Sequence, residues 1–168
     1  MADGIFPSTI TAPMSTRTRL LTIAILSLAG IAVSAYALKL HYSVEPSTFC
    51  NFNATFNCDV VNKSWASQIA GVPVALLGII GYALMLVVSL WLLLMKKLPT
   101  LAWGGLALAS LGGLGFSLFL TGVEIFDLKT FCVLCLGSQV VMLAIALLVW
   151  TSVEARHSFR SWFFSSAS

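Results

Sequence analysis

The sequence contains few charged residues. Asp, Glu, Lys and Arg make up 9% of its 168 residues, whereas roughly 25% is usual in a soluble domain. Hydrophobic residues make up 59%. With so little polar surface available, the composition predicts a membrane protein and excludes a second, soluble domain of ordinary size. The formal net charge of +3 is too small to indicate nucleic-acid binding.

Long apolar runs dominate the chain instead. Four of them have the length of about 20 residues that crosses a bilayer as a helix, and they cover residues 20–38, 72–95, 101–123 and 131–150. We therefore expect an all-α membrane protein, a bundle of four transmembrane helices. The expected organisation is an N-terminal tail over 1–18, a four-helix transmembrane catalytic domain over 19–153 and a C-terminal tail over 154–168.

The basic residues indicate how the bundle is oriented. An even number of crossings puts three basic groups on one side, namely Arg17, Arg19, Lys96, Lys97, Arg156 and Arg160, while the other side has only Lys39, Lys63 and Lys129. Basic residues favour the cytoplasmic side, so both termini are expected there. All four cysteines then lie on the exported, oxidising side. The family resemblance described below implies a bacterial inner membrane, so we expect the cysteines on its periplasmic side.

The end of the first run offers an alternative. Ala35-Tyr36-Ala37 has the A-x-A pattern of a signal-peptidase site, and cleavage there would leave three crossings. The uninterrupted run is long for a signal peptide, which favours a retained span. In the third run, small residues recur every fourth position, and we interpret this stripe as a seam between helices: Gly105, Ala109, Gly113 and Ser117.

The first exported loop, residues 41–71, contains Cys50 and Cys58. From Asp59 onward, apolar residues recur at helical spacing, at Val61, Trp65 and Ile69. This pattern predicts a short amphipathic helix between the first two spans, lying on the membrane as the roof of a cavity. The alternative is a surface helix that Trp65 merely anchors.

A C-x-x-C motif opens the last run. Cys132 and Cys135 share one face of the first turn of a helix, for which Thr130 is the expected N-cap. The positive end of the helix favours a thiolate, so the pair reads as a redox centre. Alternatively, both cysteines simply fill an apolar helix. Gln139 follows on the same face, where a buried amide needs either a partner helix or a ligand carbonyl.

The four cysteines allow three arrangements. They could form two structural disulfides, a four-thiolate zinc site or an electron relay. The C-x7-C spacing of the loop pair is wide for zinc, and no His lies near Cys132, so we expect no metal. A relay explains why a dithiol stands at the end of a spanning helix, where a quinone could accept two electrons. Cys135 and Gln139 would line the quinone pocket.

Together these residues resemble a known family. The chain is similar to the vitamin K epoxide reductase (VKOR) family, and in particular to its bacterial members, which oxidise periplasmic thiols with quinone. The resemblance covers about residues 19–150. It rests on the loop pair, on the serine six positions after it, on the segment 71–78 (GVPVALLG) and on the C-x-x-C motif, that is on Cys50, Cys58, Ser64, Cys132 and Cys135.

The resemblance implies a role for each cysteine. Cys50 would meet the partner protein, Cys58 would attack the helix disulfide at Cys132, and Cys135 would react with a diffusible quinone: ubiquinone, menaquinone or vitamin K. Ser64 would lie near the relay, and we expect Ser64 and Trp65 to join Cys135 and Gln139 in quinone binding. Many bacterial relatives carry a fused thioredoxin-like domain. This chain ends too soon to contain one, so we expect a separate thioredoxin-fold partner at Cys50 and a monomeric protein.

The resemblance also carries alternatives. Vertebrate members have a tyrosine where this chain has Gln139, which leaves epoxide reduction as an alternative activity. Two matches to the glycosylation pattern, at Asn53 and Asn62, would fit a vitamin K epoxide or quinone reductase of the endoplasmic reticulum. Quinone-linked oxidases of the DsbB type carry the C-x-x-C pair in the first exported loop, which argues against that family. A non-enzymatic membrane protein with two stapling disulfides is the remaining alternative.

Overall fold

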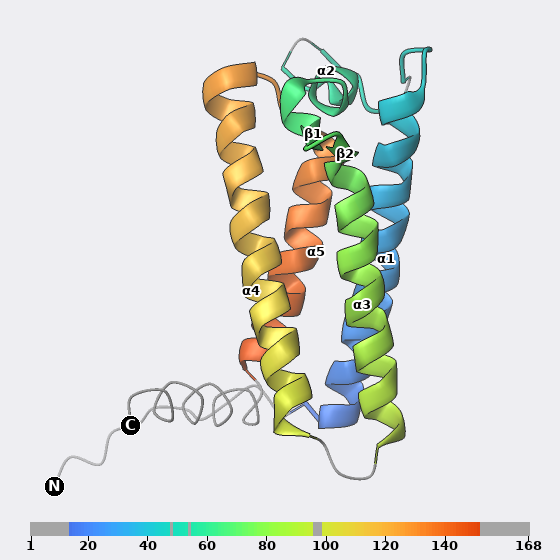
Figure 1. The fold of residues 1–168 in the computed structure, drawn as a ribbon, viewed down its shortest axis with the longest axis vertical. Helices are drawn as coiled ribbons and strands as arrows, with labels where there is room; N and C mark the ends of the chain where they lie inside the picture. The colour runs from blue at the N-terminus through green and yellow to red at the C-terminus, as the bar shows by residue number, and fades with distance from the viewer. Residues whose placement is uncertain (1–13, 48, 54, 96–98, 152–168) are drawn as a thin grey trace, which may run out of the picture.

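Four long helices lie side by side and form the body of the protein (Figure 1). The computed structural model describes residues 14–47, 49–53, 55–95 and 99–151. The helices are α1 (Thr16–Tyr42), α3 (Val74–Leu94), α4 (Thr100–Val123) and α5 (Val133–Trp150). All four are long and apolar enough to cross a membrane. The expected all-α bundle of four transmembrane helices is confirmed.

The four long helices begin and end within four residues of the four apolar runs. Helix α1 begins at Thr16, so 16–18 belong to the helix rather than to the expected tail. The A-x-A motif lies inside this continuous helix, with Ala37 buried. Residues 1–13 and 152–168 lie outside the described residues, as do Lys96, Lys97, Arg156 and Arg160, on which much of the predicted orientation rests.

The helices do not pack equally on one another. Helix α1 packs along α3 and α5, and α4 packs along α5, whereas α3 and α4 touch far less. The end of the bundle away from the cysteines has a continuous apolar core that includes Ile23, Leu92, Trp103 and Ile145. At the other end a separate buried cluster contains Cys50, Cys58 and Cys132. The site is therefore set at one end of a well-packed helical scaffold.

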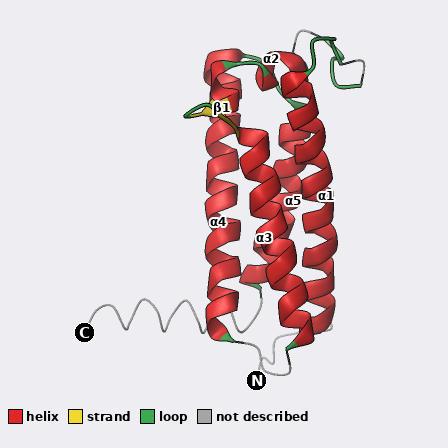
Figure 2. Cartoon of the chain, turned by 45° about the vertical axis from the view of Figure 1, so that its right-hand side comes forward, coloured by secondary structure: helices red, strands yellow, loops and turns green. Residues whose placement is uncertain are grey.

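The segment between α1 and α3 crosses the cysteine end of the bundle (Figures 1 and 2). It contains the short helix α2 (Cys58–Asn62), the 3-10 turn η1 (Trp65–Ser67) and a small antiparallel pair of strands, β1 (Gln68–Ile69) and β2 (Val72–Pro73). A positive φ of 81° at Gly71 turns the chain between these strands, a conformation that glycine adopts without strain.

The predicted short helix exists but ends sooner than the apolar spacing suggested. Ser64 has an extended backbone, with φ −73° and ψ 166°, and it interrupts the helix after Asn62. Its hydroxyl donates to the carbonyl oxygen of Val61 at 2.8 Å, which satisfies the end of the turn. Of the apolar positions, Val61 is buried, whereas Trp65 is 71% exposed. The apolar residues thus keep helical spacing beyond Asn62, although the α-helix ends there and the backbone becomes extended at Ser64.

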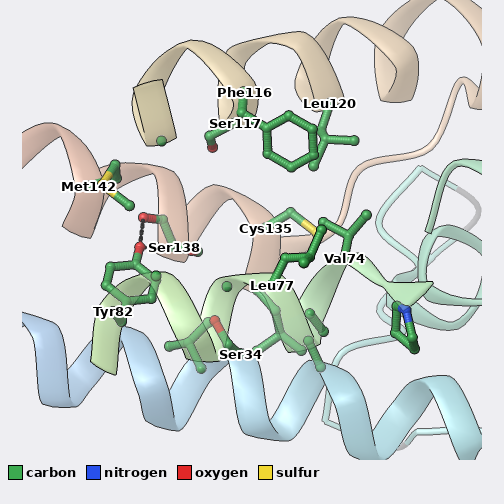
Figure 3. A pocket seen from close by; sticks show the side chains of 18 of the residues that line it. Ser34, Val74, Leu77, Tyr82, Phe116, Ser117, Leu120, Cys135, Ser138 and Met142 are labelled. Atoms are coloured by element: carbon green, nitrogen blue, oxygen red, sulfur yellow. Dashed lines mark hydrogen bonds between the residues drawn. The ribbon is translucent and has the colours of Figure 1, made fainter. Parts of the chain in front are cut away.

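Tyr82 joins three of the four helices. This α3 residue is fully buried, and its hydroxyl donates to the carbonyl oxygen of Ser138 on α5 at 2.8 Å. It also lies 2.9 Å from the side-chain hydroxyl of Ser138 (Figure 3). Its ring lies against Gly30 of α1, where an added Cβ would come within 2.5 Å of the ring atoms. The glycine is what allows the aromatic ring to sit between α1 and α5.

Gly30→Ala should therefore destabilise the bundle. Overpacking of a close contact costs about 1–3 kcal/mol, so thermal unfolding in detergent should begin at a lower temperature. Gly112→Ala is the matched control, because nothing lies within 4 Å of its added Cβ. Equal melting temperatures for the two variants would show that the Tyr82 contact does not constrain the bundle.

Candidate redox site

The structure brings the two cysteine pairs together. Cys50 and Cys58 form a disulfide, with their Cα atoms 5.6 Å apart, while Cys132 and Cys135 are free thiols. Cys58 and Cys132 are fully buried in the same apolar cluster, against which Cys135 packs. The loop pair and the helix pair are thus neighbours, as a relay between them requires.

A short backbone pairing aligns the two pairs. Phe56 and Phe131 form a parallel bridge, in which the Asn57 amide donates to the Phe131 carbonyl at 3.1 Å. The rings of Phe56 and Phe131 also pack against each other at a tilt, with their centroids 5.8 Å apart. Cys58 follows this bridge on one segment and Cys132 follows it on the other. The pairing consequently fixes the starts of α2 and α5 against each other.

Asp59 holds the segment that carries Cys50. Its Oδ2 atom accepts hydrogen bonds from the backbone amide of Ser47 at 2.8 Å and from Nδ2 of Asn51 at 2.5 Å. These two donors stand on either side of Cys50. The side chain of Asn57 accepts hydrogen bonds from the backbone amides of Asp59 and Val60 and so caps α2. These bonds fix the loop to the start of the helix.

Asn62 connects the loop pair to the helix pair. Its Nδ2 donates to the Cys58 carbonyl at 2.9 Å and to Sγ of Cys132 at 3.7 Å. Its own carbonyl oxygen lies 2.5 Å from Nδ1 of His41, at the end of α1. With 7% of its surface exposed, Asn62 has no room for a glycan in this packing. In the sequence, Asn62 stood out only as a match to the glycosylation pattern.

The predicted N-cap of the last helix was wrong. Cys132 itself is the N-cap, and its sulfur accepts a hydrogen bond from the backbone amide of Cys135 at 3.3 Å. Thr130 instead donates its backbone amide to the Glu124 carbonyl at 3.2 Å. The physical reason is the turn before it: α4 continues into the π-helical turn η2 (Glu124–Leu128), and Lys129 then adopts a left-handed conformation with φ 49°.

The surroundings of Cys132 favour its thiolate. The hydrogen bond from the Cys135 thiol lowers the pKa of Cys132 below its usual value, and burial acts in the opposite direction. The backbone amides of Cys135 and Leu134 also lower this pKa, whereas the charge of Glu124 raises it. Of the two cysteines, Cys132 is therefore the one whose surroundings match those of an activated thiol.

Glu124 is a part of the site that sequence reasoning missed. Only 2% of its surface is exposed, and its Oε2 accepts the backbone amide of Cys132 at 3.1 Å. The carboxylate and the two sulfurs lie within 4.8 Å of one another. The sequence did contain a signal for Glu124. It is an acidic residue at the end of an apolar span, eight residues before the first cysteine of the C-x-x-C motif.

Cys50 and Cys58 are bonded to each other, so their sulfurs are not available as zinc ligands in this state of the protein. A closed structural zinc site takes four protein ligands. Among the described residues, the carboxylate and the two free thiols offer three such donors.

A cavity of about 560 Å³ lies between the four helices and beneath the loop (Figure 3). The volume falls in the range of small-molecule sites, roughly 300–1,000 Å³. Cys135, Glu124 and Ser64 line it near the cysteine end. Most of the remaining lining is apolar, as with Val74, Leu77, Phe116, Leu120 and Met142.

Two expected quinone contacts lie elsewhere. Oε1 of Gln139 accepts a hydrogen bond from Oγ1 of Thr121 at 2.8 Å, which joins α5 to α4. Neither Gln139 nor the exposed Trp65 is among the described residues that line the cavity. The small residues that were interpreted as a seam between helices do line the cavity: Gly105, Ala109, Gly113 and Ser117. This stripe of α4 therefore borders the cavity as well as a helix contact.

The hydrogen bond from Cys135 should control the acidity of Cys132. Cys135→Ser keeps a side-chain donor, whereas Cys135→Ala removes it. We expect the pKa of Cys132 to be higher in the alanine variant, so that its thiolate appears only at higher pH. The ultraviolet absorbance of the thiolate, recorded against pH with the loop disulfide intact, measures this. Coincident titrations of the two variants would contradict the assignment.

Comparison with known proteins agrees with the site. The model of the vitamin K epoxide reductase family matches residues 21–150 of the 168. A search of curated proteins finds no significant match. The matched region covers most of the chain and includes all four cysteines, helix α1 from residue 21 onward and the whole of α3, α4 and α5. The chain belongs to the vitamin K epoxide reductase family of membrane oxidoreductases.

Proposed function

We propose that the protein is a quinone-dependent thiol oxidoreductase that supports disulfide bond formation. It takes electrons from a separate thioredoxin-fold protein and passes them to a membrane quinone. The observation that carries the proposal is the position of Cys135. Its free thiol lines an apolar cavity inside the bundle, while its neighbour Cys132 packs against the loop disulfide.

Electrons enter through the loop pair. A thiolate of the donor attacks Cys50, the Cys50–Cys58 bond breaks, and Cys58 leaves as a thiolate. The second thiol of the donor then resolves the mixed disulfide, so the donor is oxidised and both loop cysteines are reduced. Cys50 is only 1% exposed in the oxidised loop. The segment held by Asp59 must therefore yield when the donor docks.

The helix pair receives the electrons next. The Cys58 thiolate attacks Cys132 of an oxidised helix pair, and Cys135 leaves as a thiolate. Cys50 then attacks Cys58, which restores the loop disulfide and releases Cys132. An oxidised loop pair beside two free helix thiols, as seen here, is the state that follows this transfer. The helix dithiol then becomes a disulfide, and the quinone becomes a quinol.

We further propose that the cysteine end of the bundle faces the periplasm of a bacterial inner membrane. Arg17 and Arg19 stand at the start of α1, the opposite end from the cysteines, and the positive-inside rule favours that end for the cytoplasm. The stapling alternative would need a second disulfide. The free thiols of Cys132 and Cys135, at the wall of a cavity, speak against it.

Cys135→Ala tests the proposed activity. The purified protein is given a reduced thioredoxin-fold donor and, in separate assays, ubiquinone, menaquinone and vitamin K epoxide, and quinol formation is followed by absorbance. The variant should form no quinol, because the helix pair can no longer become a disulfide. Val140→Ala, on the exposed side of the same helix, should keep full activity. A fully active Cys135→Ala protein would end the proposal.

Asn62→Leu tests the transfer between the pairs. The variant loses the amide that contacts both Cys58 and Cys132, and a hydrogen bond to a charged group contributes about 1.5–3 kcal/mol. We expect the helix pair to be reduced at least about tenfold more slowly, while the donor reduces the loop pair at the normal rate. Rapid mixing with a trapping reagent separates the two steps. Lys63→Ala, at the next, exposed position, is the control. An unchanged transfer rate would show that Asn62 has no part in the exchange.

A further inference from the structure

Quinone reduction moves protons as well as electrons. A quinol carries two more protons than its quinone, and both must arrive inside a mostly apolar cavity. Cys132 already favours its thiolate, because hydrogen bonds lower its pKa. The proton of the Cys135 thiol is therefore the one that a nearby base must take up within the site. This question rests on the proposed function and deepens it.

We propose that Glu124 is the proton-transfer residue of the site: it accepts the proton of the Cys135 thiol and gives it to an oxygen of the reduced quinone. Three observations support this role. A carboxylate oxygen of Glu124 lies within 4.8 Å of the sulfurs of Cys132 and Cys135, the residue lines the cavity, and it is almost fully buried. It therefore lies beside the sulfur that loses a proton and borders the space in which a quinone would receive one.

Hydrogen bonds to both the side chain and the backbone of Glu124 fix the position of its carboxylate. Oε2 of Glu124 accepts a hydrogen bond from the Cys132 amide at 3.1 Å, and the backbone carbonyl of Glu124 accepts one from the Thr130 amide at 3.2 Å. Because side chain and backbone are both bound to the segment before α5, the carboxylate is held against the C-x-x-C motif. A general acid or base acts well only when it is held within hydrogen-bond distance of the proton it moves.

The other titratable groups that line the cavity are occupied elsewhere. His41 contacts the Asn62 carbonyl through Nδ1 and lies 3.0 Å from Nε2 of Gln68 through its other nitrogen. The hydroxyl of Tyr82 donates to Ser138. Glu124 is the one carboxylate among the described residues of the lining, and the thiols of Cys132 and Cys135 are the titratable groups that face it.

The step balances in protons and electrons. The S–H bond of Cys135 breaks, and its proton passes to the Glu124 carboxylate. The Cys132 and Cys135 thiolates then form the S–S bond, and the two released electrons reduce the quinone to its dianion. Glu124 returns its proton to one quinol oxygen. The other oxygen takes from water the proton that Cys132 had released earlier, so Glu124 ends the step as it began.

Glu124→Gln removes the proton acceptor and keeps an oxygen that can accept the Cys132 amide. The test is a single-turnover measurement of quinol formation, starting from the protein with its loop disulfide intact and its helix pair reduced. General acid–base catalysis typically contributes about 100-fold or more, and we expect a loss of that size near neutral pH. The rate of the variant should rise steadily with pH, since Cys135 must then ionise without help.

Two further variants separate proton transfer from a structural role. Glu124→Asp keeps a carboxylate and should retain the pH profile of the wild-type protein at a reduced rate. Asp127→Asn removes an exposed acid from the same turn and should leave both rate and profile unchanged. If the glutamine variant keeps the wild-type rate and pH profile, the role of Glu124 is refuted. If the wild-type protein forms no quinol at all, the proposed function itself has failed.

Discussion

The site depends on a short parallel pairing between two segments that are far apart in the sequence. The bridge between Phe56 and Phe131 holds the loop before Cys58 against the chain before Cys132. Thiol–disulfide exchange needs direct contact between sulfur atoms, so a relay between two pairs depends on such alignment. Asn62 strengthens the alignment, because its amide reaches both segments. Without this pairing, the disulfide and the dithiol would be separate features of one membrane protein.

The two pairs occupy different environments, and each environment suits one partner. The loop disulfide lies in a segment that crosses the end of the bundle and is held by Asp59, and the proposed protein donor would dock there (Figure 1). Cys135 instead lines an apolar cavity between the helices, which suits a quinone from the lipid phase. Glu124 brings a buried carboxylate to the boundary between the two. In the proposed relay, the loop pair would therefore meet the protein donor and Cys135 would meet the quinone.

Much of this organisation could be predicted from the sequence, because hydrophobic length and cysteine spacing are local signals. The four spans, the short helix after Cys58 and the redox motif follow from them. The neighbours of the motif do not. Thr130 looked like an N-cap, but the π-helical turn and the left-handed Lys129 start the helix later. Trp65 kept helical spacing although Ser64 had already ended the helix. The roles of Glu124 and Asn62 come from tertiary contacts that no local pattern encodes.

The central claim is that Cys132 and Cys135 form the last dithiol of the relay. The most direct measurement uses protein with an intact loop disulfide and a reduced helix pair, mixed with quinone in the absence of oxygen and of any donor. The account predicts one quinol per protein molecule, and peptide mass spectrometry should then find a new disulfide between Cys132 and Cys135. Absence of quinol, or quinol formed while both helix thiols stay reduced, would contradict it.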